Sequence, residues 1–183
     1  MTREDVYALV NEYTKNPSLV KHMLAVEAAM RAYARKFGED EETWGVIGLL
    51  HDFDYERWPS RDDHPFRGAE ILRSKGVADD WIQTILSHAD YSGVPRTTLR
   101  DKALFAVDEL CGFLTACAYV RPDRKIATVE VESVKKKLKQ KSFAAQVSRD
   151  DITNGAEELG IPLDAHIAFV RDAMTSVSDD LGL

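Results

Sequence analysis

The spacing of apolar residues is the feature that most constrains how this chain folds. Apolar side chains recur every three or four positions over most of its length, and no stretch shows the strict alternation typical of a strand. Between positions 17 and 37, the residues on the apolar face are Leu19, Met23, Val26, Met30 and Tyr33. The pattern therefore predicts an all-α protein.

Helix start and stop signals divide the chain into separate helical segments. Pro17 favours a first helical turn, Gly38 favours a helix end, and Thr98 is a good N-cap. The expected helices cover residues 3–14, 17–37, 40–52, 64–76, 77–88, 99–120, 129–143, 149–159 and 162–177. We interpret residues 53–63, which include Pro59 and many charges, as a loop. Because no linker or repeat interrupts the chain, we expect residues 1–183 to form a single domain.

Composition excludes several classes of protein. The chain has 183 residues, of which 44% are hydrophobic and 30% charged, as is ordinary for a soluble globular domain. No run approaches the roughly 20 apolar residues that cross a bilayer, so no membrane partner is expected. The net charge of −7 disfavours broad nucleic-acid binding. The two cysteines lie on one expected helix and the start of the chain has no signal-peptide character, so we expect a cytoplasmic protein.

Several polar residues stand where apolar ones are expected. Asp108 lies within a strongly apolar helix, and an unpaired buried carboxylate costs several kcal/mol. His22 shares the inward face of its helix with apolar residues, and His51 and His88 lie at helix ends. Imidazole and carboxylate are common ligands of transition metals, and facing helices of a bundle can bring such ligands together. A bound cation would explain these positions.

A purely structural interpretation competes with this one. A single histidine on an apolar face is more often a hydrogen-bonded core residue than a ligand. The combination is harder to explain in that way, because the polar residues follow one another in a definite order. They are His22, His51, Asp52, His64, His88 and Asp108. His166 falls outside the pattern and we interpret it as structural or as a surface residue.

The order His, His-Asp, Asp resembles the HD-domain superfamily of metal-dependent phosphohydrolases. His22, His51, Asp52 and Asp108 carry the resemblance, which covers a core of about residues 16–120 and leaves 121–183 as a C-terminal helical extension. The additional His64 and His88 resemble the subset with the order His, His-Asp, His, His, Asp. The flanking stretches GLLHDFDY and HPFRGAEIL are similar to the family's helix ends. The Gly-Tyr-Pro motif of the HD-GYP phosphodiesterases is missing, which disfavours cyclic-dinucleotide hydrolysis.

The resemblance implies an all-α helical bundle with a metal site at its centre. Asp52 would bridge two divalent ions or bind a single one. His22, His51 and Asp108 would complete the shell of the first ion, and His64 and His88 would hold a second. The identity of the metal stays open among Mn, Fe, Mg, Co, Ni and Zn.

The implied activity is hydrolysis of a phosphoester of a small metabolite or nucleotide by metal-activated water. Arg57, Arg61 and Arg67 are candidates for binding the phosphate of this small phosphorylated substrate. The lysine-rich run 135–141 is a second candidate, although such runs are usually solvated faces. Asp54 is a candidate proton shuttle beside Asp52.

Two other functions stay open at this point. Six ligands rich in histidine also suit a di-iron oxygenase of the HD type. An HD module that senses a nucleotide without turnover is the third hypothesis, although the complete ligand set argues against it. The sequence leaves the substrate and the oligomeric state open.

Overall fold

A computed structural model describes residues 1–183, and it confirms the all-α prediction. No strand is present. The helices are α1 (Arg3–Tyr13), α2 (Pro17–Phe37), α3 (Glu41–Leu50), α4 (Phe66–Ser74), α5 (Asp79–Ser87), α6 (Leu99–Tyr119), α7 (Val131–Leu138), α8 (Arg149–Glu158), α9 (Leu163–Thr175) and α10 (Ser178–Leu181). Short 3₁₀ turns cover Asp90–Ser92 and Ile126–Thr128. None of these helices is long and apolar enough to span a membrane.

Local side-chain chemistry fixes the ends of the helices that carry the site. The Asn16 side chain accepts a hydrogen bond from the backbone N–H of Ser18 at the start of α2, and Pro17 occupies the first turn. Gly38 ends α2 in the left-handed conformation, with φ of 73°. Thr98 and Asp101 form a capping box at the start of α6.

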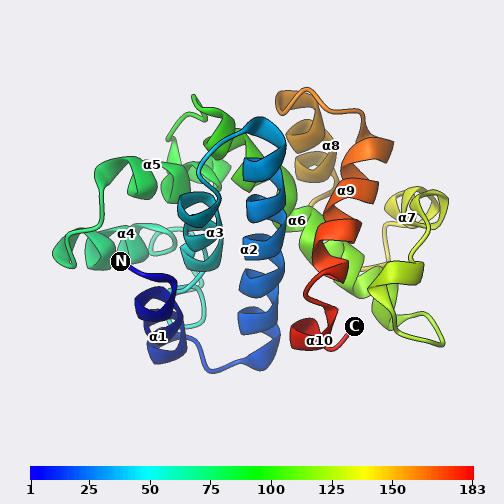
Figure 1. Cartoon of the computed structure of the whole chain (residues 1–183), viewed down its shortest axis with the longest axis horizontal. Helices are drawn as coiled ribbons and strands as arrows, with labels where there is room; N and C mark the ends of the chain where they lie inside the picture. The colour runs from blue at the N-terminus through cyan, green and yellow to red at the C-terminus, as the bar shows by residue number, and fades with distance from the viewer.

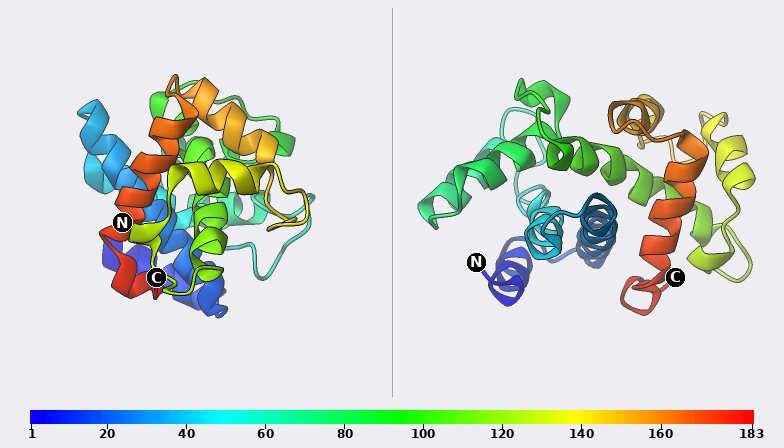
Figure 2. Two further views of the ribbon diagram at one scale, coloured as in Figure 1. Left: turned by 90° about the vertical axis from the view of Figure 1, so that its right-hand side faces the viewer. Right: turned by 45° about the horizontal axis from the view of Figure 1, so that its top comes forward.

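The helices are arranged around α2. Figure 1 shows α3 on one side of α2 and α9 on the other, and both helices pack against it. In the right-hand view of Figure 2, α2 and α3 are seen nearly end-on, and α6 crosses them on one face. Helix α6 packs against both α2 and α5, and α3 also packs against α2 and α5, so these four helices adjoin one another.

One connected hydrophobic core joins the N-terminal helices to the C-terminal extension. It includes Val26 of α2, Leu104 of α6 and Val170 of α9, all with no exposed surface. Helix α8 approaches α6 closely, because a Cβ added at Gly155 would lie 2.6 Å from Cα of Ala106. The extension is thus packed against the same helix that carries Asp108.

Two elements differ from the prediction. Helix α7 ends at Leu138, whereas the lysine-rich pattern predicts a helix to Phe143. The reason is tertiary, because the guanidinium of Arg149 binds carbonyl groups of the residues that follow α7. Ala144 in this stretch has a φ of 42°, which is incompatible with a right-handed helix. The four-residue α10 was not predicted.

Candidate metal centre

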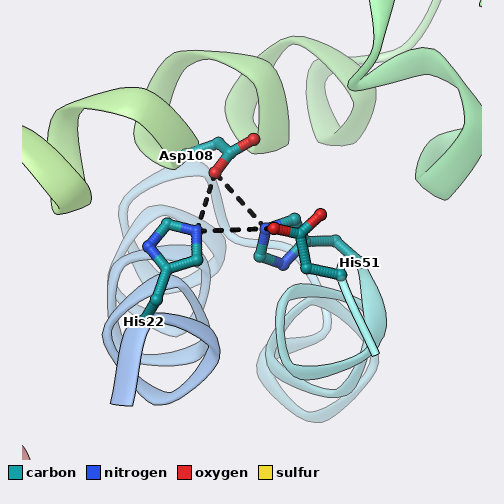
Figure 3. A group of neighbouring side chains, drawn as sticks. His22, His51 and Asp108 are labelled. Carbon is teal, nitrogen blue, oxygen red and sulfur yellow. Dashed lines mark hydrogen bonds and ion pairs between the residues drawn. The ribbon is translucent and has the colours of Figure 1, made fainter. Parts of the chain in front are cut away.

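Four side chains from three helices converge beside α6. His22 lies on α2, His51 and Asp52 follow the last turn of α3, and Asp108 lies on α6. The Nε2 atom of His22 is 2.9 Å from Oδ1 of Asp108, and Nε2 of His51 is 3.3 Å from the same oxygen. Figure 3 shows the two imidazoles and the Asp108 carboxylate facing one another. Their donor atoms, together with Oδ2 of Asp52, all lie within 4.8 Å of each other.

A second group of donors adjoins the first and shares Asp52 with it. Oδ1 of Asp52 is 3.3 Å from Nε2 of His64 and 3.5 Å from Nε2 of His88. Metal–nitrogen and metal–oxygen bonds are about 2.1 Å long, so ligands of one ion lie about 3–4 Å apart. Both groups have this spacing. The two oxygens of Asp52 face different groups, which is the arrangement of a bridging carboxylate.

Hydrogen bonds orient three of the imidazoles. The Nδ1–H of His51 donates to the carbonyl of Gly48 over 2.8 Å, and that of His64 donates to Oδ1 of Asp54 over 2.8 Å. Nδ1 of His88 bonds to the carbonyl of Ile85 in the same way. These contacts assign the proton to Nδ1, which leaves the Nε2 lone pair of each ring directed at the cluster.

The donor set fits a bound cation. Nε2 of His51 is fully buried and has no hydrogen-bond partner. The Nε2 atoms of His64 and His88 lie 3.3 Å apart, so two lone pairs would face each other unless a proton or a metal ion lies between them. Buried polar atoms of this kind are costly when left unpaired. A divalent cation would satisfy all of them, and imidazole with carboxylate is the ligand chemistry that transition metals accept.

The electrostatics of the cluster also favour a positive charge at its centre. Burial by itself would lower the pKa of His51, but the carboxylates of Asp52 and Asp108 outweigh it and raise that pKa well above its ordinary value. Burial likewise opposes ionisation of Asp108, yet the neighbouring His51 and His22 hold its pKa far below its usual range. Without a metal ion, His51 therefore retains its proton more strongly than a free imidazole does.

The cluster opens into a cavity of about 810 Å³. Its walls come from α2, the α3–α4 connection, the turn after α5, α6, the segment before α8 and the first turn of α8. The lining residues include Leu19, Tyr55, Arg61, Ala89, Tyr91, Phe105, Glu109, Gly112, Gln146, Ser148 and Asp151, together with the donors His22, Asp52, His64, His88 and Asp108. A cavity of this size admits a small metabolite.

The predicted phosphate-binding arginines are separated by the fold. Arg61 lines the cavity, where its guanidinium lies 5.2 Å from the ring centroid of Tyr91. Arg57 instead packs on Tyr13 and donates to the carbonyl of Glu12, and Arg67 pairs with surface carboxylates. Neither Arg57 nor Arg67 lines the cavity.

The lysine-rich run also lies elsewhere. Lys135 pairs with Glu132 and Asp164 on the exposed side of α7, and no residue of the run lines the cavity. Residues 135–138 of the run belong to the end of α7, and residues 139–141 follow it as exposed chain.

Asp54 lies behind the metal cluster and does not line the cavity. Its carboxylate accepts hydrogen bonds from Nδ1–H of His64 and, over 2.8 Å, from the backbone N–H of Gly68. The side chain is 1% exposed. Gly68 permits this contact, because a Cβ there would lie 2.8 Å from Cγ of Asp54. The geometry therefore places Asp54 as a partner of His64.

Four polar cavity residues were missed by sequence reasoning. Glu109 follows Asp108 on α6, while Gln146, Ser148 and Asp151 come from the C-terminal extension. Burial and the adjacent Asp108 charge raise the pKa of Glu109 to about 7. The position of Glu109 next to Asp108, a predicted metal ligand, was the one sequence feature that could have identified it as a cavity residue. Nothing in the local sequence marks the other three.

His166 is structural. It has no exposed surface, its Nε2–H donates to the carbonyl of Ala106 over 2.8 Å, and its Nδ1 accepts from the hydroxyl of Tyr33 over 2.6 Å. Burial lowers its pKa, in keeping with a neutral ring.

The family model for the HD domain matches residues 19–112, which include His22, His51, Asp52, His64, His88 and Asp108. No solved structure matches the chain.

Proposed function

The chain belongs to the HD domain family, and we infer that it is a metal-dependent phosphohydrolase that cleaves a phosphoester of a small metabolite or nucleotide. One observation carries this proposal. Six donor side chains, spread over the matched region, converge in two groups around Asp52, and all of them except the buried His51 line a cavity. This geometry supplies both a place for divalent cations and a place for the substrate beside them.

The residues divide into two ion sites. His22, His51, Asp108 and one oxygen of Asp52 would hold the first ion, and His64, His88 and the other oxygen of Asp52 would hold the second. When bound, the ions would polarise a phosphoryl oxygen and lower the pKa of a bound water toward neutrality.

The remaining roles fall to residues of the cavity wall. Arg61 is the one lysine or arginine that lines the cavity, and it has no carboxylate partner, so it is free to bind a phosphate. The Tyr91 ring supports its guanidinium at 5.2 Å. Asp54 holds the imidazole of His64 in the orientation that exposes Nε2. Arg57 and Arg67 have no part in this proposal, because they do not reach the cavity.

The same donors suit a di-iron oxygenase, and four histidines with two carboxylates are the observation that favours it. The two chemistries differ in a simple readout. An oxygenase consumes dioxygen and depends on iron, whereas a phosphohydrolase releases inorganic phosphate without consuming oxygen.

The test is a screen of small phosphoesters with the metal-free protein reconstituted with Mn²⁺, Co²⁺, Ni²⁺, Fe²⁺ or Mg²⁺. We expect metal-dependent phosphate release that Asp52→Ala abolishes, because that substitution removes the ligand shared by both groups. The matched control is Asp62→Ala, an exposed carboxylate of the same connection that contacts neither group. Oxygen uptake without phosphate release would refute the hydrolase, and equal turnover by Asp52→Ala would refute the assignment of the activity to this site.

A further inference from the structure

One wall of the cavity comes from outside the region that matches the family. Gln146, Ser148 and Asp151 all line the cavity, and all lie beyond residue 112. Gln146 is exposed, and no hydrogen bond within the chain engages its side chain. This wall therefore belongs to the C-terminal extension, although the metal ligands do not.

The wall is held in place by a single guanidinium. Arg149 donates to the carbonyl of Ala144 over 2.7 Å and to that of Gln140 over 3.3 Å, and it also binds the carbonyls of Phe143 and Val147. An arginine presents five N–H donors in a planar fork, so it can reach acceptors that lie too far apart for the single ammonium of a lysine. Arg149 thus fixes the path of the chain from Gln140 to Ser148.

Arg149 and the segment that it binds, which we call the clamp, pack against the helix that carries the metal ligand Asp108. The guanidinium of Arg149 lies 5.1 Å from the ring centroid of Phe113 on α6, and the ring of Phe143 packs edge-on against Phe113 at 5.4 Å. The backbone N–H of Ser148 donates to the carboxylate of Glu109 over 3.2 Å. The wall is therefore positioned relative to the metal centre from two sides.

Charge is unevenly distributed over the cavity. Arg61 lies on the α3–α4 connection, whereas Glu109 and Asp151 lie on α6 and α8 with no lysine or arginine bonded to either carboxylate. Asp90, by contrast, pairs with Arg96 over 2.6 Å. A second anionic group on a substrate would meet the Asp151 carboxylate, which no lysine or arginine neutralises, and a cationic group would meet complementary charge there.

We propose that residues 140–148 together with Asp151 form the substrate-selecting wall of the cavity, that Arg149 is its positioning residue, and that the wall favours a phosphoester whose organic part carries a positive charge. The proposal rests on the proposed function for the location of the phosphate. It assigns the contacts to the organic part to Gln146, Ser148 and Asp151, with Glu109 beside them.

The test measures binding to the Mn²⁺-loaded protein by calorimetry, so it does not depend on turnover. The probes are inorganic phosphate, 2-aminoethyl phosphate and phosphoglycolate, of which the last two have similar size but opposite charge at the far end. We expect 2-aminoethyl phosphate to bind at least tenfold more tightly than phosphoglycolate. Asp151→Asn is expected to reduce this ratio at least threefold and to leave the affinity for inorganic phosphate within twofold.

Arg149→Ala tests the positioning role. It should also reduce the ratio of affinities for 2-aminoethyl phosphate and phosphoglycolate at least threefold. The metal content should be unchanged, and hydrogen exchange at the Ser148 amide should be faster. Arg149→Lys should behave similarly, because one ammonium cannot replace the planar guanidinium. Gln146→Ala probes the wall without touching the clamp and should weaken 2-aminoethyl phosphate alone. Asp150→Asn, the exposed neighbour of Asp151, is the matched control and should change nothing.

A ratio near one in the unaltered protein would overturn the proposal, as would equal loss of inorganic phosphate binding in Asp151→Asn. Failure of the proposed function gives a different result. Selective binding without phosphate release from any ester would refute the hydrolase and leave the wall intact, whereas hydrolysis without charge selectivity would refute the wall alone.

Discussion

The imidazoles of the cluster depend on hydrogen bonds that lie behind them. His64 is the clearest case, because its Nδ1–H is held by Asp54, which in turn accepts from the backbone of Gly68. A partner of this kind fixes the orientation of a metal-binding imidazole, and its loss typically costs 10–100-fold in metal affinity or activity.

Asp54→Ala is therefore expected to weaken the second ion site by about 10–100-fold and to spare the first. Titration of Mn²⁺ into the metal-free protein, followed by calorimetry, measures both. Asp62→Ala serves as the control, because its carboxylate is exposed and bonds to no histidine. Unaltered binding in Asp54→Ala would show that the hydrogen bond has no part in holding His64.

The same histidine gives a pH dependence. Burial disfavours the charged form of His64, but the hydrogen bonds that its ring donates to Asp52 and Asp54 outweigh it and raise its pKa to about 9. Below pH 9 an incoming ion must displace this proton, so metal affinity should rise as the pH rises and level off above about 9.

Calorimetry in two buffers of different ionisation enthalpy checks this by counting the protons released per ion at pH 7.5. We expect net proton release in the unaltered protein and less of it in His64→Gln. Affinity that is constant between pH 7 and pH 9 would contradict the assignment.

For single residues, the sequence predicted the metal-binding side chains better than it predicted the residues that surround them. His22, His51, Asp52 and Asp108 stand out because polar residues interrupt apolar helix faces, and the structure brings their donor atoms together. The side-chain directions of Arg57 and Arg67 depend on partners such as Tyr13 and Asp63, which no local pattern reveals.

Helices were predictable where capping residues and apolar periodicity agree. Helix α2 begins at Pro17 and ends at Phe37, as predicted. Helix α7 is shorter than predicted because the side chain of Arg149 binds the backbone carbonyls that follow the helix. Arg149 itself lies more than ten residues beyond the end of α7. An interaction between segments of this kind overrides local helix propensity.

The close contact between α8 and α6 predicts that a larger residue at position 155 destabilises the fold. Gly155→Ala places a Cβ about 2.6 Å from Cα of Ala106, so α8 must move away from α6. We expect a loss of roughly 1–3 kcal/mol in the free energy of unfolding, measured in urea. Asn154→Ala, an exposed position of the same helix, should change it by less than about 0.5 kcal/mol.

For the whole molecule, the metal centre links folding to metal binding. His22 on α2, His51 after α3 and Asp108 on α6 come from separate parts of the chain, and they meet only in the folded state. A ligand that binds only the folded state stabilises it by mass action, by about 2.7 kcal/mol at one hundred times the dissociation constant.

Adding Mn²⁺ to the metal-free protein should therefore raise its melting temperature by several degrees, and a chelator should reverse the shift. Asp52→Ala should lose most of this shift because it removes a ligand from both groups. An equal shift in Asp52→Ala would place the stabilising ions elsewhere on the acidic surface.

The central claim is that six side chains bind cations in two adjacent positions, and anomalous scattering from crystals grown with Mn²⁺ tests it most directly. The account predicts two anomalous peaks, one on each side of the Asp52 carboxylate, each about 2.1 Å from its donor atoms. Crystals of saturated protein that show no peak between His22, His51, Asp52 and Asp108 would contradict it.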